Sequence, residues 1–250
     1  MSNPAEVQRS VPRTARERAR AQITREILQA ARQHLATDGA PALSLRAIAR
    51  DLGMASSAVY RYVASRDELL TRLIIDAYDS LGAAAEAAEG AVDRDDLTGR
   101  WSTVCNAVRR WALANPNEYA LIYGSPVPGY VAPPDTIAPA SRVSALLVRI
   151  LVDATAKGRL EPAILEDAVP AATEAALAPI RALVPAPVPD ALILRGLMAW
   201  TALYGTVSFE LYGQLHNVVG EEPGDREAYF AECVRRWALH VGITQDQSLR

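Results

Sequence analysis

One short stretch carries side chains that can bind polyanions by hydrogen bonding and stacking. Ser56, Ser57, Tyr60, Arg61 and Tyr62 offer hydroxyl and guanidinium donors together with two aromatic rings. Such groups suit phosphate oxygens and the edges of bases. The chemistry that this pattern predicts is therefore recognition of a nucleic acid.

The residue types that covalent catalysis requires are sparse. Of the three histidines, His34, His216 and His240, none belongs to a recognisable catalytic motif. Cys105 and Cys233 lie 128 positions apart with no other Cys or His at ligand spacing. We therefore expect no catalytic residues, no metal and no cofactor. An all-α enzyme and a helical interaction module without DNA binding remain the alternative interpretations.

The polar stretch is positioned by two short helices joined by a tight turn. Residues 45–52 place apolar side chains at i, i+3, i+4 and i+7, one face of a helix that Ser44 can cap through its hydroxyl. Gly53 then ends this helix, because glycine adopts positive φ without steric cost. A second helix is predicted over 56–63, with its valines facing back toward the first. The polar side chains are thereby left outside.

The segment resembles the DNA-binding part of TetR-type transcriptional regulators. The resemblance covers Thr14 to Leu81 and includes the cap, the glycine turn, the aromatic-rich third helix and a fourth helix capped at Ser65. Many members have Ser or Thr where this chain has Ala55, so Ser56 is expected to take over that cap. The resemblance implies an all-α fold, with an N-terminal three-helix helix-turn-helix domain and a larger helical domain for ligand binding and dimerisation. A helical hairpin inside an all-α core is the alternative.

The distribution of charge supports this division. Residues 1–66 contain 11 Arg and five acidic residues, a local charge of +6, whereas the whole chain of 250 residues carries −3. A basic N-terminal part followed by an acidic remainder is typical of a specific DNA-binding protein whose second domain has a partner other than DNA. We expect a flexible arm over 1–12, the DNA-binding domain over 13–66 and the effector-binding and dimerisation domain over 67–250, with a helix over 66–88 connecting them.

The partner of the first domain is expected to be double-stranded operator DNA. In this prediction Tyr60 and Tyr62 contact a phosphate or a thymine methyl group, and Arg61 contacts a phosphate or a guanine. Arg46 is expected on the flanking backbone, and Arg66, with the amides at its helix start, on a phosphate. The predicted DNA-binding residues are Ser44, Arg46, Ser56, Ser57, Tyr60, Arg61, Tyr62 and Arg66.

Apolar periodicity and breakers predict helices throughout the chain. The sequence Ser65-Arg-Asp-Glu68 is a capping box, in which each side chain bonds the other residue's amide. His34 lies on the apolar side of its helix and is expected to be packed and hydrogen-bonded. The predicted helices outside the helix-turn-helix run over 14–38, 66–88, 97–114, 118–123, 141–156, 162–183, 190–217 and 225–241.

Large aromatic residues mixed with Ala and Gly recur in the second domain. Such a mixture can fill a core or line a pocket, and the family resemblance implies an effector cavity. Few ionisable groups accompany these aromatics, so the predicted effector is a small, mainly apolar molecule. The candidate ligand-binding residues are Trp101, Cys105, Trp111, Tyr119, Tyr123, Trp200 and Tyr204.

A two-fold homodimer is predicted, because one recognition helix spans too few base pairs for specificity. The last two helices would form a four-helix bundle with their partners. The alternative is that their apolar residues only close the core of the monomer. The candidate interface residues are Val207, Leu211, Tyr212, Leu215, Phe230, Val234 and Trp237.

A second resemblance concerns the larger domain. Asn115 to Pro134 is similar to the effector domain of an actinobacterial TetR subgroup named for a Trp-His-Gly pattern, for which Trp200 to Gly205 is the candidate. Tyr204 stands where that pattern has His, which puts any role of the His in doubt. No apolar run of about 20 residues or signal core is present, so we expect a cytoplasmic protein without a membrane partner.

Overall fold

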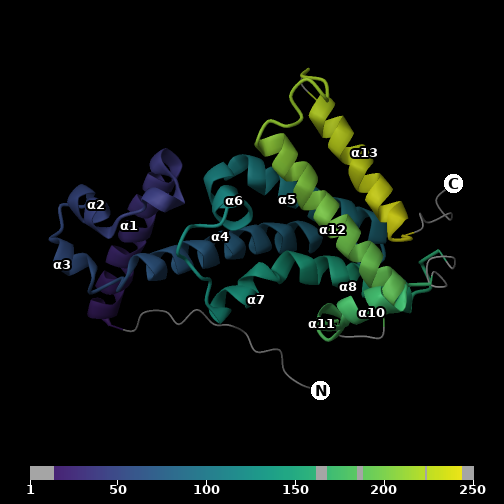
Figure 1. Ribbon diagram of the computed structural model, residues 1–250, viewed down its shortest axis with the longest axis horizontal. Coiled ribbons are helices and arrows are strands. Elements are labelled where there is room, and N and C mark those ends of the chain that lie inside the picture. Colours follow the sequence, from purple (N-terminus) through teal and green to yellow (C-terminus); the bar gives the residue numbers. More distant parts are fainter. Residues whose placement is uncertain (1–13, 162–167, 185–187, 223, 244–250) are drawn as a thin grey trace. The chain divides into compact units, whose positions relative to one another are not determined.

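The computed structural model describes residues 14–161, 168–184, 188–222 and 224–243 (Figure 1). Contacts divide the chain into two compact units. The first unit contains residues 1–74 and 125–133, and the second contains 75–124 and 134–250. The sequence placed the boundary after residue 66, whereas the first unit also holds 67–74 and the loop 125–133. The arm expected over 1–12 lies outside the described residues.

The first unit is built from short helices. Its first helix begins with a reciprocal cap, because Thr14 Oγ1 accepts from the Glu17 amide at 3.2 Å and Glu17 Oε2 accepts from the Thr14 amide at 2.9 Å. Gly39 ends that helix with a φ of 74°. The helix predicted over 14–38 is thus confirmed. The elements are α1 (Ala15–Asp38), η1 (Ala40–Ala42), α2 (Leu45–Asp51), α3 (Ser56–Val59) and the start of α4 (Arg66–Glu89).

Apolar side chains of α1, α2, α3, the segment after α3 and the start of α4 are buried in the first unit. Burying a Val, Leu or Ile side chain contributes about 1.5–3 kcal/mol relative to leaving it exposed. These side chains hold the helix-turn-helix together, and the valines predicted to face inward belong to them. Ile27, Ala31, Ile48, Val59, Val63, Leu69 and Leu70 are all fully buried.

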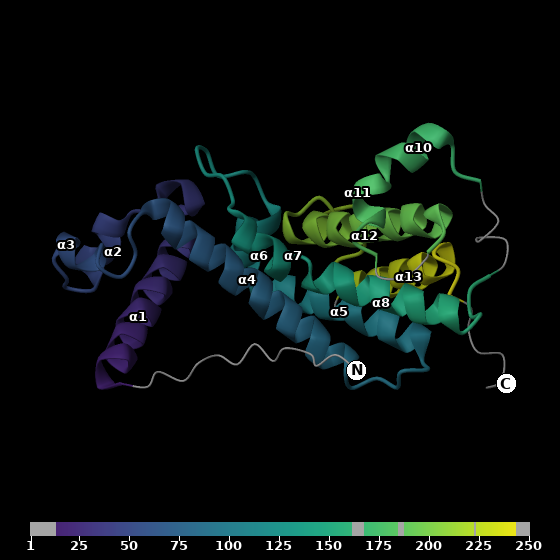
Figure 2. The ribbon, with the colours of Figure 1, turned by 90° about the horizontal axis from the view of Figure 1, so that it is seen from below.

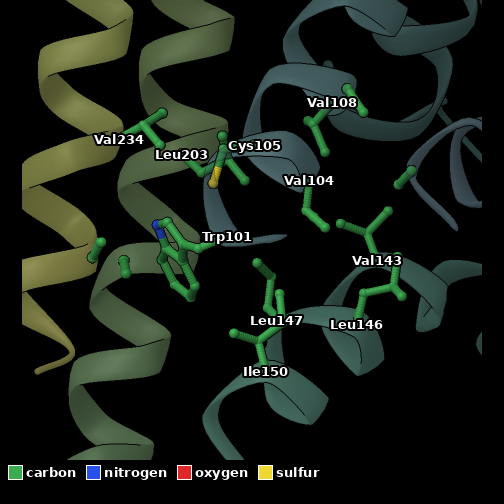
Figure 3. Packing of buried hydrophobic residues seen from close by; sticks show 14 of the residues in the cluster. Trp101, Val104, Cys105, Val108, Val143, Leu146, Leu147, Ile150, Leu203 and Val234 are labelled. Carbon is green, nitrogen blue, oxygen red and sulfur yellow. The ribbon is translucent and has the colours of Figure 1, made fainter. Parts of the chain in front are cut away.

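The second unit is a bundle around α5 (Leu97–Ala114), which packs against α6 (Pro116–Tyr123), α8 (Arg142–Ala156), α12 (Asp190–Leu211) and α13 (Asp225–His240) (Figure 2). Figure 3 shows Trp101 and Val104 of α5 beside Leu147 of α8 and Leu203 of α12. The helix predicted over 97–114 is confirmed, with Asp96 accepting from the Gly99 amide at 2.7 Å. The remaining elements are α6 (Pro116–Tyr123), η2 (Pro134–Thr136), α7 (Ile137–Ala140), α8 (Arg142–Ala156), α10 (Ala171–Ala176), α11 (Ala178–Arg181), α12 (Asp190–Leu211) and α13 (Asp225–His240).

Two arginines, one buried and one partly buried, join helices of this bundle. Arg100 of α5 is 1% exposed and donates to Glu89 of α4 at 2.7 Å and to Asp153 of α8 at 2.8 Å. Arg109 of α5 forms a bidentate pair with Glu210 of α12 at 2.7 and 2.6 Å. Charges that leave water need such partners, so removing Glu210 would leave the Arg109 guanidinium without its carboxylate, whereas Arg100 has two.

Several predicted helix limits change. The helix expected over 162–183 lies partly outside the described residues. Its described part forms two separate helices, α10 and α11, each with a proline at its start. The helix expected to reach residue 217 ends at Leu211, where Gly213 adopts a φ of 83°. Among the described residues the only β-type pairing is one antiparallel bridge between Leu160 and Ile243.

One helix of the described chain, α12, is long and apolar enough to span a membrane. Core helices of water-soluble proteins meet the same criteria of length and hydropathy, so this finding is weak evidence for a membrane. In this structure one side of α12 packs into the second unit through Leu192, Leu203 and Val207.

Candidate DNA-binding surface and ligand cavity

The turn between α2 and α3 depends on one glycine. Gly53 has a φ of 62°, in the left-handed region, and the Met54 amide closes the turn by donating to the Ala49 carbonyl at 2.8 Å. Ala49 is 1% exposed, so the chain passes closely over a small side chain. The glycine turn predicted from the sequence is confirmed.

The second helix of the motif is shorter than predicted. The α-helix α3 covers only Ser56–Val59, and the chain then tightens, with the Arg61 amide donating to the Ala58 carbonyl at 3.2 Å. The predicted side-chain caps are also wrong. Ser44 is the N-cap residue of α2 but makes no side-chain cap bond, and α3 begins after Ala55 without Ser56 serving as its cap.

Five of the eight predicted DNA-binding residues are exposed. Tyr60 is 46% exposed although it directly follows a fully buried valine. The inward turn of Val59 and Val63 therefore leaves the neighbouring polar side chains at the surface. The exposed residues are Arg46, Ser56, Ser57, Tyr60 and Arg61.

Tyr62 and Ser44 are only partly exposed. The Arg20 guanidinium of α1 lies 5.3 Å from the centre of the Tyr62 ring, a cation–π contact. Tyr62 thus ties the end of α3 to α1. A role in DNA contact stays a prediction for this residue.

Arg66 has an internal role that the sequence did not indicate. Its Nε donates to the Leu43 carbonyl at 3.1 Å, and Nη2 donates to the carbonyls of Ala40 at 3.0 Å and Pro41 at 3.2 Å. The first of these carbonyls follows η1 and the other two belong to it, so Arg66 fixes the segment that leads into α2. Its contact with a phosphate stays a prediction.

The capping box at the start of α4 is half confirmed. Ser65 Oγ accepts from the Glu68 amide at 3.0 Å, as predicted, but Glu68 Oε2 accepts from the Ala64 amide at 2.6 Å instead of the Ser65 amide. That backbone bond and Arg72 lower the pKa of Glu68, against the effect of burial. The predicted hydrogen bonding of His34 is confirmed, because its Nε2 lies 2.6 Å from Asp51 Oδ2 on α2.

The second unit contains an apolar cavity of about 190 Å³ between α5, α8, α11 and α12. Two of the seven predicted ligand-binding residues, Trp101 and Trp200, line it. Gly196 adds to its wall, where a Cβ atom would lie 3.3 Å from Leu151 Cδ1. Helix α11 supplies another wall through Ile180. The sequence predicted a helix there but gave no sign that it lines a cavity.

The other five predicted ligand-binding residues do not line this cavity. Tyr119 is fully buried, its hydroxyl lying 2.9 Å from Ser208 Oγ and 3.2 Å from the Tyr204 carbonyl, and burial raises its pKa to about 12. Cys105 is fully buried, which raises the pKa of its thiol. Trp111 donates to Ser80 Oγ at 2.9 Å. In this structure Cys105, Trp111, Tyr119, Tyr123 and Tyr204 thus pack in or against the core of the second unit, and a ligand contact stays a prediction for them.

These tyrosines form a chain of rings. The centres of the Trp200 and Tyr204 rings lie 5.5 Å apart, and those of Tyr204 and Tyr123 of α6 lie 4.3 Å apart. Tyr123 lies 5.9 Å from Tyr78 of α4, in an edge-to-face arrangement. Burial raises the pKa of Tyr123 and Tyr204, so both hydroxyls stay neutral. Ring contacts therefore link the wall of the cavity to α4.

Most predicted interface residues are buried within the monomer. Val207, Phe230 and Val234 are at most 2% exposed and Leu215 is 6% exposed, so their assignment to a dimer interface is wrong. Of the seven, Tyr212 is the most exposed, at 44%. Helix α12 does have one exposed face, whose residues recur every three or four positions along the helix. This face, which we call the α12 face, contains Met198, Thr201, Gly205, Phe209 and Tyr212.

A helix-turn-helix with an exposed polar end, followed by a larger helical bundle, is the architecture of a DNA-binding transcriptional regulator. Comparison with known families agrees. Residues 27–73 match the model for bacterial regulatory proteins of the tetR family, and residues 101–237 match the model for the tetracyclin repressor-like C-terminal domain. The chain belongs to the TetR family of transcriptional regulators, which are not enzymes.

Relatives cover most of this chain. The HTH-type transcriptional regulators Rv1816 of Mycobacterium tuberculosis and Mb1846 of Mycobacterium bovis are each 41% identical over 82% of this chain and 88% of their own length. The crystal structure of SCO4313 is similar, with a TM-score of 0.72 and 36% identity over 90% of this chain and 98% of that one. The all-α fold with an N-terminal helix-turn-helix domain is thus confirmed.

Proposed function

We propose that this TetR-family regulator is a cytoplasmic repressor that binds its operator as a homodimer and is released by a small, mainly apolar effector. The observation that carries the proposal is the exposed polar surface around α3, which stands over fully buried valines. The apolar cavity of the second unit supports the effector.

We place Ser56, Ser57, Tyr60 and Arg61 in the major groove. Their hydroxyl and guanidinium groups can donate to phosphates and base edges, and the Tyr60 ring can contact a thymine methyl group. Arg46, exposed on α2, would contact the flanking backbone. Tyr62 and Arg66 would position this surface through their contacts with α1 and with the segment before α2.

The dimer is proposed to form through the α12 face. Met198 and Phe209 are 51% and 54% exposed. Exposed apolar side chains that lie together on one helix face are typical of a protein–protein interface. Gly205 lies between them, and a Cβ atom there would meet nothing within 4 Å. A second copy of α12 can therefore approach closely at this glycine, as in helix pairs that form four-helix bundles.

We propose that the cavity communicates with α4 through the rings of Trp200, Tyr204, Tyr123 and Tyr78. A ligand that moves the Trp200 ring would displace rings in contact with it, and α4 continues into the first unit as one helix. A preference of about 2–3 kcal/mol between two positions of α4 would change DNA affinity by about 30- to 150-fold.

The membership of the Trp-His-Gly subgroup stays a prediction. Tyr204, at the position of its His, is 8% exposed and packs between Trp200 and Tyr123. A tyrosine in this setting supplies a ring and a neutral hydroxyl, so any role of a titrating imidazole in that subgroup would not transfer to this chain.

The experiment is selection of binding sites from random duplex DNA, followed by affinity measurements on the enriched sequence with and without compounds that raise Tm. We expect an enriched sequence with two-fold symmetry, and at least one compound that weakens binding to it. A reporter gene behind that sequence should be less active when the protein is present. Failure to enrich any sequence, or activation of the reporter, would contradict the proposal.

A further inference from the structure

The apolar cavity of the second unit adjoins a second, larger hollow. This groove has a volume of about 650 Å³ and follows the outer side of α8. Ser144, Val148, Ile180 and Val184 line both spaces. A molecule held in the cavity can therefore extend past these four residues into the groove.

The two spaces differ in charge. Among the described residues, no charged side chain lines the cavity, and Ser144 uses its hydroxyl proton on the Ser141 carbonyl at 2.9 Å. The groove has three charged side chains in its wall, Glu86, Arg142 and Arg149. A ligand that spans both spaces thus meets an apolar end and a charged end.

Two of these charges already satisfy each other. Arg142 Nε donates to Glu86 Oε1 at 2.9 Å, and Arg142 Nη2 donates to Glu86 Oε2 at 2.6 Å. The Nη1 of the same arginine donates to Asp79 Oδ1 at 2.8 Å and to the Asp79 carbonyl at 2.9 Å. This bonding lowers the pKa of Glu86, so its carboxylate stays charged and bound.

Arg149 is the charged residue of the groove that takes no part in these hydrogen bonds. It is exposed on α8, next to Val148 in sequence, and forms no hydrogen bond or ion pair with the described residues. Its charge acts on Glu86 only at a distance, as the lowered pKa of Glu86 reflects. The fork of a guanidinium binds a carboxylate through two parallel hydrogen bonds.

We propose that the effector is an amphipathic monocarboxylate, with its apolar part in the cavity and its carboxylate on Arg149 in the groove. This inference rests on the proposed function, because it assigns a chemical class to the ligand of the same cavity. The size of the cavity limits the apolar part. An engineered cavity of about 150 Å³ holds benzene, so about 190 Å³ suits one ring or a chain of about six to eight carbons.

The experiment compares each carboxylic acid with its primary amide, which has the same apolar part but no charge. Hexanoate, octanoate and phenylacetate, and their primary amides, are titrated into the full-length protein at pH 7.5 by calorimetry. The apolar parts of each pair are the same, so a difference in Kd reports on the carboxylate. We expect at least one acid to bind about tenfold more tightly than its amide, since a hydrogen bond to a charged group is stronger than one to a neutral group.

Three variants locate the binding. In Arg149→Gln the acid should bind only as well as its amide, whereas Arg110→Gln, an exposed arginine of α5 outside both spaces, should keep the tenfold preference. In Gly196→Leu both the acid and the amide should lose binding, because the new side chain enters the cavity. Thermal unfolding of each variant checks that the protein is folded. Val148→Trp gives a second block if Gly196→Leu does not fold.

The outcomes separate this inference from the proposed function. Amides that bind as tightly as acids, or an acid preference that survives in Arg149→Gln, overturn the inference and leave the apolar effector site standing. If no acid and no amide binds, this assignment of the ligand is overturned. Operator binding is measured separately, so its loss or presence tests the regulator and not the ligand class.

Discussion

At the scale of single residues, the proposed DNA-binding surface consists of side chains that the fold leaves exposed. Arg61 is exposed, so its replacement should not disturb the core. We predict that Arg61→Ala weakens operator binding and, if Arg61 contacts a phosphate, lowers the slope of log affinity against log salt by about one. Arg110→Ala, which removes an exposed arginine of the second unit, is the control. Equal salt slopes and affinities for both variants would contradict the assignment.

The sequence predicted this surface because its signals are local. A glycine with positive φ and two inward valines four residues apart follow from short-range sterics and periodicity, and Gly53, Val59 and Val63 all take those roles. The sequence did not predict the partners of Arg66, because its bonds go to backbone carbonyls about 23 to 26 positions away. Any arginine can reach a carbonyl, so residue type carries no signal for such a contact.

The two cysteines should differ in reactivity. Cys105 is fully buried and its thiol pKa is raised by burial, whereas Cys233 is partly exposed. Thiolates react and buried thiols do not. We predict that Cys233→Ser protein shows no reaction with a thiol reagent until denaturant is added, while Cys105→Ser protein reacts more rapidly. Rapid labelling of Cys105 in the folded Cys233→Ser protein would be inconsistent with its packing beside Trp101 in Figure 3.

At the scale of elements, we expect His240, at the end of α13, to make the stability of the protein depend on pH. Burial and the nearby charge of Arg195 lower the pKa of His240, so the folded state favours the neutral ring. Below the ordinary pKa of about 6.5 the unfolded chain binds a proton that the folded chain resists, and stability falls. We predict that the urea midpoint drops from pH 7.5 to pH 5.5, and that His240→Gln reduces this drop. An unchanged drop would mean that other groups cause it.

The α12 face makes a prediction about assembly. Phe209→Glu places a charge at the centre of a surface that a second copy would cover, and burying an unpaired charge is costly. We predict that this variant is monomeric by light scattering at micromolar concentration and binds the operator weakly. Leu113→Glu, at a similarly exposed apolar residue of α5, should remain dimeric. A dimer that persists in Phe209→Glu would place the interface elsewhere.

Helix periodicity finds apolar faces, but it cannot tell which apolar face meets the monomer's own core. Both of the last two helices carry apolar residues that could meet a partner, and the prediction included Val207 and Phe230 but not Phe209. Burial separates them, with the first two at most 1% exposed and Phe209 at 54%. Most wall residues of the cavity were missed for the same reason, although Trp101 and Trp200 were predicted, because the walls come from four helices that only the tertiary fold brings together.

At the scale of the whole molecule, regulation requires that the cavity changes the DNA-binding unit, and the ring chain from Trp200 to Tyr78 is the physical link that we propose. We predict that Tyr123→Leu keeps operator binding and ligand binding but reduces the effect of one on the other. In the natural chain, a compound that raises Tm should weaken operator binding by about 30- to 150-fold. In Tyr123→Leu the same compound should weaken it by less than about fivefold, because the ring that contacts both Tyr204 and Tyr78 is gone.

The conservative variant keeps this prediction testable. Tyr123→Phe retains the ring and loses only the hydroxyl, so it should regulate almost as the natural chain does. Loss of a large partly buried side chain destabilises a protein by a few kcal/mol, and Tyr123→Leu must therefore be measured below its own Tm. Because coupling between two sites is reciprocal, operator DNA should weaken ligand binding by the same factor in each variant. Full regulation in a folded Tyr123→Leu protein would show that the signal reaches α4 by contacts other than these rings.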